Sequence, residues 1–407
     1  MTLPANHPLE DGRTSGSALV TTYRGTRGDR TPVWFMRQAG RSLPEYRELR
    51  VGTRMLDSCL DPAMASEITL QPVRRHGVDA GIFFSDIVIP LKLAGVDVEI
   101  EPGRGPVLAH PVRTLADVEA LPSPAGADFS AIEQGVALTV AALGSTPLIG
   151  FAGAPFTLAA YLVEGGPSKD HIRARTLMHS DPEAWHGLLT WAADVTGAFL
   201  RAQVLAGTSA AQLFDSWVGS LSKADYVSRV APYSARALDA IRDLEVPVVH
   251  FGVGSGEVLR EMRDVGRTDA GTDAHADADA DADADARAGG GAVAGSGAGT
   301  ASAAGGSRGG LRVDAVGVDW RIPLDEAARR LGGGVTVQGN IDPALLAAPW
   351  PVLEAHVLDV LQRGRAARAH VLNLGHGVPP ETDPTVLTRI VELVHAQTPD
   401  HHDQDAA

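Results

Sequence analysis

Two arginines beside a short apolar run are the first residues of this chain whose types and spacing suit them to chemistry. The run 33–36, VWFM, is followed by Arg37, Gln38, Ala39, Gly40 and Arg41. The first acidic residue after this segment is Glu45. A guanidinium binds a carboxylate or a phosphate through paired hydrogen bonds. We therefore expect an anion-binding segment; the alternative is a strand end that simply emerges into water.

Polar residues also follow other apolar runs. Asp86 ends AGIFFSD, Ser216 ends AQLFDS, His376 follows HVLNLG, and Tyr161 lies within GFAGAPFTLAAYLVEGG. The structural alternatives for these residues are a helix cap, a turn or a place in the core. One shared site would explain all four positions together.

Eight short apolar runs are typical of strands buried on both faces. They are 33–37, 79–86, 147–154, 210–216, 246–252, 315–320, 335–340 and 369–375. Their continuous apolar character, rather than alternation, favours a parallel sheet.

Helical patterns separate these runs, notably over 182–206, 223–244 and 324–331. The alternation predicts an α/β fold, a single-domain (β/α)8 TIM barrel, although periodicity alone leaves a doubly wound open sheet as the alternative. In a barrel, the polar residues would share the carboxyl-terminal end of the strands. The segment 95–112 alternates around a Pro/Gly turn and predicts an inserted hairpin.

One segment, 268–310, differs from the rest because it repeats Asp-Ala and is then rich in Gly, Ala and Ser. Such a composition predicts disorder, since it buries too little apolar area to offset chain entropy. Cation binding by its Asp run is the alternative, but a regular Asp repeat without a turning glycine is a poor calcium site. We expect a barrel over 23–396 interrupted by this insertion, and flexible tails over 1–22 and 397–407.

Composition narrows the class of protein. The net charge of −15 argues against a nucleic-acid surface. We find no apolar run typical of a membrane span and no signal-peptide pattern. Cys59 is the single cysteine, which excludes an internal disulfide and any zinc site that needs two thiolates, and fits a reducing cytoplasm.

Several motifs together resemble the uroporphyrinogen decarboxylase family. They are WFMRQAGRSLPEYRELR, FFSDI, GFAGAPFTLAAYLVEGG, QLFDSW, VGVDW, QGNIDP and NLGHGV. The resemblance implies a cytoplasmic (β/α)8 barrel, usually a homodimer, without a metal or organic cofactor. It also implies decarboxylation of the four acetate side chains of uroporphyrinogen III to methyl groups, giving coproporphyrinogen III in haem biosynthesis. The insertion departs from the family pattern, and we expect it to emerge away from the site.

The resemblance also implies roles for individual residues. Those matching the family's substrate-binding positions are Arg37, Gln38, Ala39, Gly40, Arg41, Asp86, Tyr161, Ser216 and His376. The residues expected to be catalytic are Asp86, Arg37 and His376. An ionised Asp86 would accept pyrrole N–H groups and stabilise a cationic macrocycle. The proton donor stays open among His376, Tyr161 and Arg37.

Apolar neighbours and rival functions complete these expectations. Phe84, Ile87 and Phe156 could contact the flat macrocycle, and core packing is the equal alternative for each. One rival function is cobalamin-linked methyl transfer to a thiol, which needs zinc bound by a His and two Cys. Another is a non-catalytic tetrapyrrole-binding protein.

Overall fold

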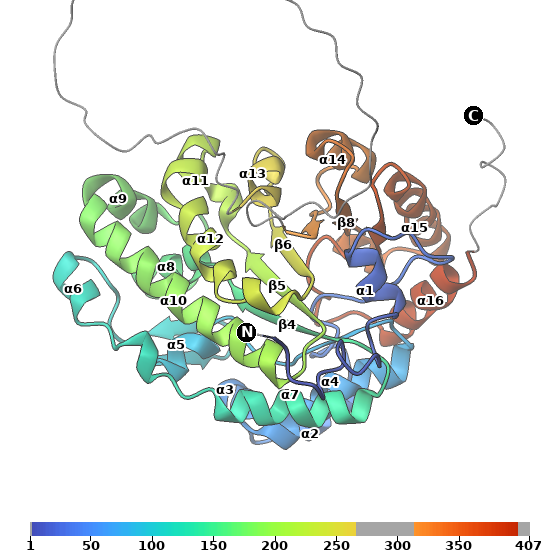
Figure 1. The fold of residues 1–407 in the computed structure, drawn as a ribbon, viewed down its shortest axis with the longest axis horizontal. Helices are drawn as coiled ribbons and strands as arrows, with labels where there is room; N and C mark the ends of the chain where they lie inside the picture. The colour runs from blue at the N-terminus through green and yellow to red at the C-terminus, as the bar shows by residue number, and fades with distance from the viewer. Residues whose placement is uncertain (1, 266–312, 398–407) are drawn as a thin grey trace, which may run out of the picture.

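A seven-stranded parallel sheet forms the centre of the computed structural model, which describes residues 2–265 and 313–397 (Figure 1). The strand order is β1-β4-β5-β6-β7-β8-β9, so the strands lie side by side in the order in which they occur in the sequence. The strands are β1 (Gly81–Ile82), β4 (Leu148–Gly153), β5 (Ala210–Asp215), β6 (Val248–Gly252), β7 (Ala315–Gly317), β8 (Thr336–Gln338) and β9 (His370–Val371). Seven of the eight predicted runs thus contain a strand, each shorter than its run.

The first run, 33–37, contributes one bridge rather than a strand. Val33 forms an isolated parallel bridge with Leu372, and the Leu372 N–H donates to the Pro32 carbonyl at 2.9 Å. On its other side, the Asp79 N–H donates to the Val33 carbonyl at 2.8 Å. The Asp79 carboxylate accepts from the Val33 N–H at 2.8 Å, so a side chain takes the donor that a longer ladder would use. The fold is therefore TIM-barrel-like, with this segment lying between β9 and the start of β1.

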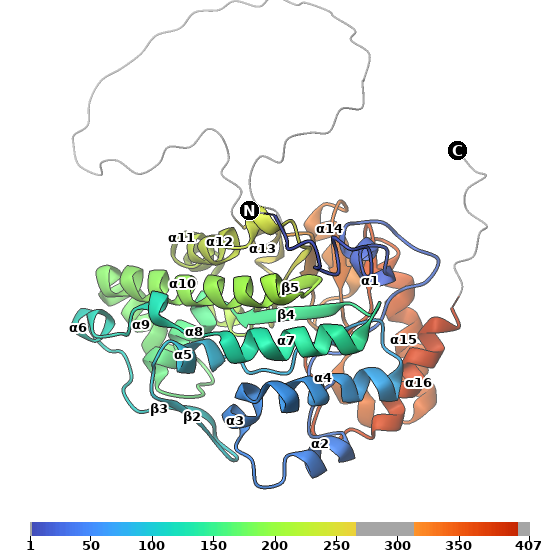
Figure 2. The same ribbon diagram turned by 60° about the horizontal axis from the view of Figure 1, so that its bottom comes forward.

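Helices follow the strands and cover the outside of the sheet (Figures 1 and 2). They are α1 (Ala18–Tyr23), α2 (Pro44–Leu49), α3 (Met55–Leu60), α4 (Pro62–His76), α5 (Ile89–Leu93), α6 (Leu115–Glu119), α7 (Ser130–Leu143), α8 (Pro155–Glu164), α9 (Ile172–Ser180), α10 (Pro182–Ala206), α11 (Lys223–Arg229), α12 (Ala231–Asp239), α13 (Leu259–Arg263), α14 (Leu324–Leu331), α15 (Trp350–Gly364) and α16 (Pro384–His395). Short 3-10 turns lie at Pro124–Gly126, Val218–Ser220, Arg242–Leu244 and Pro343–Ala347. None of the described helices is long and apolar enough to cross a bilayer.

Two of the predicted helices, α10 and α14, have the expected bounds. The third, over 223–244, is divided into α11, α12 and a 3-10 turn. Pro232 stands in the first turn of α12 and has no N–H to continue the helix from α11. Proline therefore accounts for the break at Val230.

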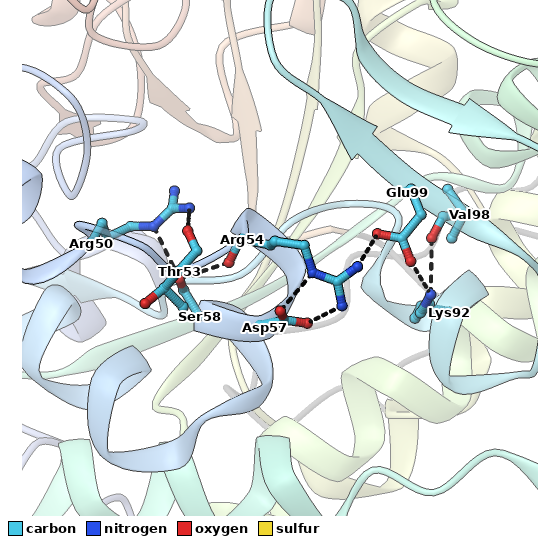
Figure 3. Close-up of polar contacts among 8 residues, drawn as sticks. All are labelled: Arg50, Thr53, Arg54, Asp57, Ser58, Lys92, Val98 and Glu99. Atoms are coloured by element: carbon cyan, nitrogen blue, oxygen red, sulfur yellow. Dashed lines mark hydrogen bonds and ion pairs between the residues drawn. The ribbon is translucent and has the colours of Figure 1, made fainter.

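The predicted hairpin is confirmed as β2 (Val98–Glu101) paired antiparallel with β3 (Gly105–Leu108). Charged contacts join it to α3 and α5 (Figure 3). Arg54 donates to Asp57 at 2.8 Å and pairs with Glu99 at 3.6 Å. Glu99 also accepts from Lys92 at 2.6 Å. These contacts are largely exposed, so they orient the hairpin more than they stabilise the fold.

The N-terminal residues differ from the predicted flexible tail. His7 Nε2 lies 3.0 Å from the Val204 carbonyl oxygen, and the Thr14 hydroxyl lies 2.8 Å from the Ser209 hydroxyl. Leu19 is fully buried. His7 and Thr14 therefore hold the N-terminal segment against the end of α10 and the start of β5, and α1 packs against β9. The predicted insertion, 268–310, and residues 398–407 of the predicted C-terminal tail lie outside the described residues.

We predict that Asp79→Ala destabilises the fold, because this carboxylate bonds groups on both sides of the sheet closure. It accepts from the Val33 N–H, from Arg30 at 2.5 Å, and lies 2.9 Å from His395 Nε2. Its side chain is 6 % exposed. Loss of these partners should lower the free energy of unfolding by about 2–4 kcal/mol in urea titrations. Asp239→Ala is the control.

Asp239 has one exposed ion pair, with Arg242 at 3.3 Å, so its replacement should change stability by less than about 0.5 kcal/mol. Equal stabilities of the two variants would contradict the proposed closure role of Asp79.

Candidate active site

The predicted site residues lie on segments that follow the carboxyl ends of the parallel strands. Arg37 follows the bridge at Val33, Asp86 follows β1, Ser216 follows β5 and His376 follows β9. Tyr161 lies on α8, which begins directly after β4. Parallel strands bring these loops to one edge of the sheet, where catalytic groups of TIM-barrel-like enzymes are found.

Arg37 has an unusual backbone and a close glycine neighbour. Its φ of 59° lies in the left-handed region, which is uncommon for a residue with a side chain. A Cβ on Gly377 would lie 2.4 Å from Arg37 Cδ, so this position needs glycine to admit the arginine side chain. Arg37 and Arg41 are exposed, and within the described ranges neither makes an ion pair or a side-chain hydrogen bond. Both guanidiniums are thus available to an anion.

Gln38 has a supporting position. Its side chain is fully buried, its Oε1 accepts from the Phe35 N–H at 3.0 Å, and its Nε2 donates to the Ala80 carbonyl at 3.0 Å. These bonds hold the turn before Arg37 against the start of β1. The side chain therefore does not face a ligand. Ala39 and Gly40 are half-buried beside it.

Asp86 is half-buried at the end of the β1 segment. One carboxylate oxygen accepts from the Val88 N–H at 3.0 Å, and the other has no hydrogen-bond partner among the described residues. Burial raises the pKa of Asp86 above its ordinary value, opposed by the Val88 N–H and the Arg37 charge. An unused acceptor oxygen thus lies within electrostatic reach of a guanidinium.

Tyr161 belongs to the same group. Its side chain is 9 % exposed, and burial raises its pKa, with a further contribution from Asp86 that Arg37 opposes. Its ring centroid lies 4.0 Å from that of Trp217, which in turn stacks on His171 at 4.1 Å. In the described part of the chain its hydroxyl has no partner, so it remains free to meet a ligand.

His376 is half-buried, and its ring is nearly perpendicular to the Trp320 ring at a centroid distance of 6.3 Å. Burial lowers its pKa, Arg37 and Arg321 lower it further, and Asp319 opposes them. His376 is therefore neutral near pH 7. The Arg37 charge acts on His376 as it does on Asp86 and Tyr161, so the four residues form one group.

The structure brings together Arg37, Asp86, Tyr161 and His376, but it does not link all the predicted residues. For Arg41 and Ser216 it records no contact with those four within the described ranges. Ser216 is half-buried next to the fully buried Asp215. These two residues share the same edge of the sheet, and their roles stay predictions.

The apolar candidates separate into core and site residues. Phe84 packs edge-on against Tyr46 at 5.7 Å, and Phe156 against Trp185 at 6.2 Å. Both are at least 95 % buried, so the core alternative holds for them. Ile87 is half-buried beside Asp86 and is the one of the three still able to contact a ligand.

Two residues near His376 and one near Tyr161 were not expected from the sequence. Trp320 and Arg321 follow Asp319 in the loop after β7, and Trp217 follows Ser216. The motifs VGVDW and QLFDSW contain the tryptophans, but the pattern gave no reason to place them against a histidine or a tyrosine. Such neighbours come from different loops, and only the fold brings them together.

This arrangement suits a large anion that also carries N–H donors. The guanidiniums bind carboxylates in two-point fashion, while Asp86 accepts from N–H groups. A metal centre has no evident donor set, because no group of three His, Cys, Asp or Glu side chains suited to a metal converges within residues 2–265 and 313–397.

The chain is similar to known proteins along most of its length. The family model described as Uroporphyrinogen decarboxylase (URO-D) matches residues 14–297 and 295–397. Proteins named uroporphyrinogen decarboxylase from Leifsonia xyli and an Arthrobacter species are each 60 % identical, covering 97 % and 96 % of this chain and 98 % and 100 % of theirs. Among solved structures, a methyltransferase from Methanosarcina mazei has a TM-score of 0.68 at 16 % identity, covering 93 % of this chain and 97 % of that one. The last likeness concerns the fold alone.

We predict that Gln38→Leu lowers stability, because it leaves the Phe35 N–H and the Ala80 carbonyl buried without their partner. The free energy of unfolding should fall by about 2–4 kcal/mol, measured by urea titration. Gln134→Leu is the matched control, since Gln134 is exposed on α7 and should tolerate the change. Unchanged stability with weakened ligand binding would instead return Gln38 to the ligand-contacting residues.

Proposed function

This chain belongs to the uroporphyrinogen decarboxylase family, and we propose that it converts uroporphyrinogen III to coproporphyrinogen III by removing carbon dioxide from four acetate side chains. The observation that carries this proposal is the grouping of Arg37, Asp86, Tyr161 and His376 at one edge of the sheet. The substrate carries carboxylates for the guanidiniums and four pyrrole N–H donors for the carboxylate.

The fold supports a closed, single-domain (β/α)8 barrel over 23–396. On one side the Pro32 carbonyl and the Trp34 N–H bond Leu372, which directly follows β9, and on the other side Val33 bonds Asp79; together these bonds supply the eighth position of the ring. By family resemblance the protein works as a homodimer in the cytoplasm, and a single cysteine fits that compartment.

The chemistry requires an electron sink, which the substrate supplies once it is protonated. A proton added to the pyrrole carbon next to the acetate creates an iminium-like cation. The C–C bond electrons then flow into the ring as carbon dioxide leaves. The remaining methylene carbon takes up a proton to become methyl, and the ring proton is lost, so the net reaction consumes one proton for each carboxylate removed.

Asp86 stabilises this cation. An ionised carboxylate accepts pyrrole N–H bonds, and its attraction grows as the macrocycle becomes positive, which is stabilisation specific to the transition state. Burial disfavours the ionised form in the free protein. Pyrrole donors on the substrate would restore it, because hydrogen bonds to a carboxylate lower its pKa.

The choice among the three candidate proton donors, His376, Tyr161 and Arg37, rests on their charge and their exposure. The lowered pKa of His376 leaves it neutral, and a neutral imidazole positions a substrate group better than it supplies a proton. The raised pKa of Tyr161 likewise holds its proton firmly. A guanidinium holds its proton at least as firmly, so the choice rests on resupply: Arg37 is the proposed donor because it is exposed to water that can return a proton, with Arg41 and Ser216 as substrate-binding residues.

The rival thiol methyl transfer is disfavoured by the ligands it needs. The chain has one cysteine, and Cys59 is buried with its pKa raised by that burial. A zinc site with two thiolates cannot be assembled from it. A non-catalytic tetrapyrrole binder is distinguished by the assay below.

The described flanks of the insertion support its placement away from the site. The Val313 N–H donates to the Arg263 carbonyl at 3.4 Å, so the flanks on the two sides lie close together. Val313 precedes β7, whereas the site residues follow the other ends of the strands. We infer that the insertion enters at the amino-terminal end of the sheet.

Asp86→Asn should reduce turnover at least about a hundredfold, since it removes a preorganised negative charge. The assay incubates uroporphyrinogen III anaerobically with a reductant and counts the carboxylates on the product. Because the wild-type pKa is raised, kcat/KM should fall with decreasing pH through a value above 3.8, and the variant should lose this limb. Asp239→Asn is the control, and near-normal turnover of Asp86→Asn would refute the role.

Replacing residues 268–310 by a short Gly-Ser linker should leave kcat and KM within about twofold of wild type. The reason is that the flanking residues already lie close together, away from the site. Steady-state assays of both proteins provide the comparison. A large loss of turnover with unchanged thermal unfolding would place the insertion near the substrate.

A further inference from the structure

Arg321 is a third guanidinium near the site, in the loop after β7. Its Cζ lies 4.0 Å from the centroid of the Trp320 ring, and its guanidinium pairs with the Asp319 carboxylate. Asp319 is 1 % exposed and also accepts from the Gly254 N–H at 2.6 Å. The arginine is thus held between an aromatic face and a fixed carboxylate, a geometry that restricts its rotamers.

The loop that carries Arg321 is itself firmly held. Asn340 Nδ2 donates to the Asp319 carbonyl at 2.8 Å and to the Ile322 carbonyl at 2.6 Å. A Cβ on Gly375 would lie 2.3 Å from the Trp320 backbone nitrogen. The loops after β7 and β9 therefore pack backbone against backbone, which fixes Trp320 next to His376.

The charge of Arg321 acts on the His376 imidazole, as the charge of Arg37 does. The Trp320 ring is nearly perpendicular to the His376 ring, and Arg321 lies over the face of Trp320. The charges that act on His376 are Arg37 and Arg321, which lower its pKa, and Asp319, which raises it. Two guanidiniums from different loops consequently share one neighbour in the site.

Arg321 retains hydrogen-bonding capacity for a ligand. Its guanidinium has five N–H donors, and within the described residues the only hydrogen bond recorded for the guanidinium is the one to Asp319. The side chain is 50 % exposed. Donors on a restrained and half-exposed guanidinium can meet an anion at a lower entropic cost than those on a free arginine.

We propose that Arg321 binds a carboxylate of the tetrapyrrole substrate beside His376, as a specificity-determining residue in addition to the segment 37–41. This inference rests on the proposed decarboxylase function. Asp319, Trp320 and Asn340 serve it by positioning, since they hold the guanidinium without themselves needing to touch the substrate.

Arg321→Gln tests the proposal in steady-state decarboxylation of uroporphyrinogen III. Loss of one charge-assisted contact should raise KM about tenfold and leave kcat within about threefold. Arg321→Lys should recover part of the loss, since it keeps the charge without the planar fork. Arg329→Gln is the control, because Arg329 is 71 % exposed on α14 and pairs with Glu326.

Assays with partly decarboxylated intermediates as substrates show which substrate carboxylate Arg321 binds, an acetate or a propionate. If Arg321 binds a propionate, the rise in KM should be equal for substrates with eight, seven and five carboxylates. If it binds an acetate, the rise should disappear once that acetate has become a methyl group. Either result supports the proposal, whereas an unchanged KM for every substrate overturns it.

Two readouts do not depend on turnover. The affinity for uroporphyrin, an oxidised octacarboxylate, measured by fluorescence titration, should weaken about tenfold in Arg321→Gln. The NMR titration midpoint of His376, assigned with His376→Asn, should rise in the same variant. If wild type binds uroporphyrin but does not decarboxylate uroporphyrinogen, the proposed function fails and the binding comparison still decides the role of Arg321. An unchanged affinity for uroporphyrin, or an unmoved His376 titration midpoint, overturns the proposed role of Arg321. Thermal unfolding of the variants and the Arg321→Lys variant control for a folding defect.

Discussion

The two edge strands of a curled parallel sheet need hydrogen-bond partners, because an exposed edge strand leaves backbone donors and acceptors unpaired. Here a very short segment meets this constraint. Pro32 and Trp34 hydrogen-bond Leu372, directly after β9, on one side, and Val33 hydrogen-bonds Asp79 on the other. The chain then leaves the sheet at once, and Arg37 emerges only four residues after Val33. The closure of the sheet and the position of the first guanidinium are thus one local structure.

The candidate site consists of charged side chains whose positions are restrained by the surrounding residues. Arg37 takes a left-handed backbone and fills space that Gly377 leaves open, while Gln38 secures the turn from beneath. Asp86 keeps one oxygen on the Val88 N–H and the other free. Because such groups are already ordered before a ligand binds, they lose little conformational entropy on binding, which favours tight and selective binding of a flexible polyanion.

Sequence patterns predicted seven of the strands well, because buried parallel strands are continuous apolar runs, and the polar residues at the ends of these runs were the basis for the predicted site. They failed where one contact overrides a pattern. The run 33–37 became a single bridge because the Asp79 carboxylate takes its donor. The Gln38 side chain is buried and bonds backbone groups, although Arg37 beside it is exposed. For Phe84 and Phe156, where the sequence left both alternatives open, the core alternative holds. Arg321 carries no sequence signal beyond its type, since Asn340 and His376, which lie against its loop and place it in the site, are distant in the chain.

The buried N-terminal segment has a consequence for synthesis on the ribosome. His7 and Thr14 are made almost two hundred residues before their partners Val204 and Ser209. The helix α1, which carries the buried Leu19, packs against β9, which is made later still. During synthesis this segment therefore waits for its partners with apolar side chains exposed, and chaperones that shield nascent chains would have a binding site there.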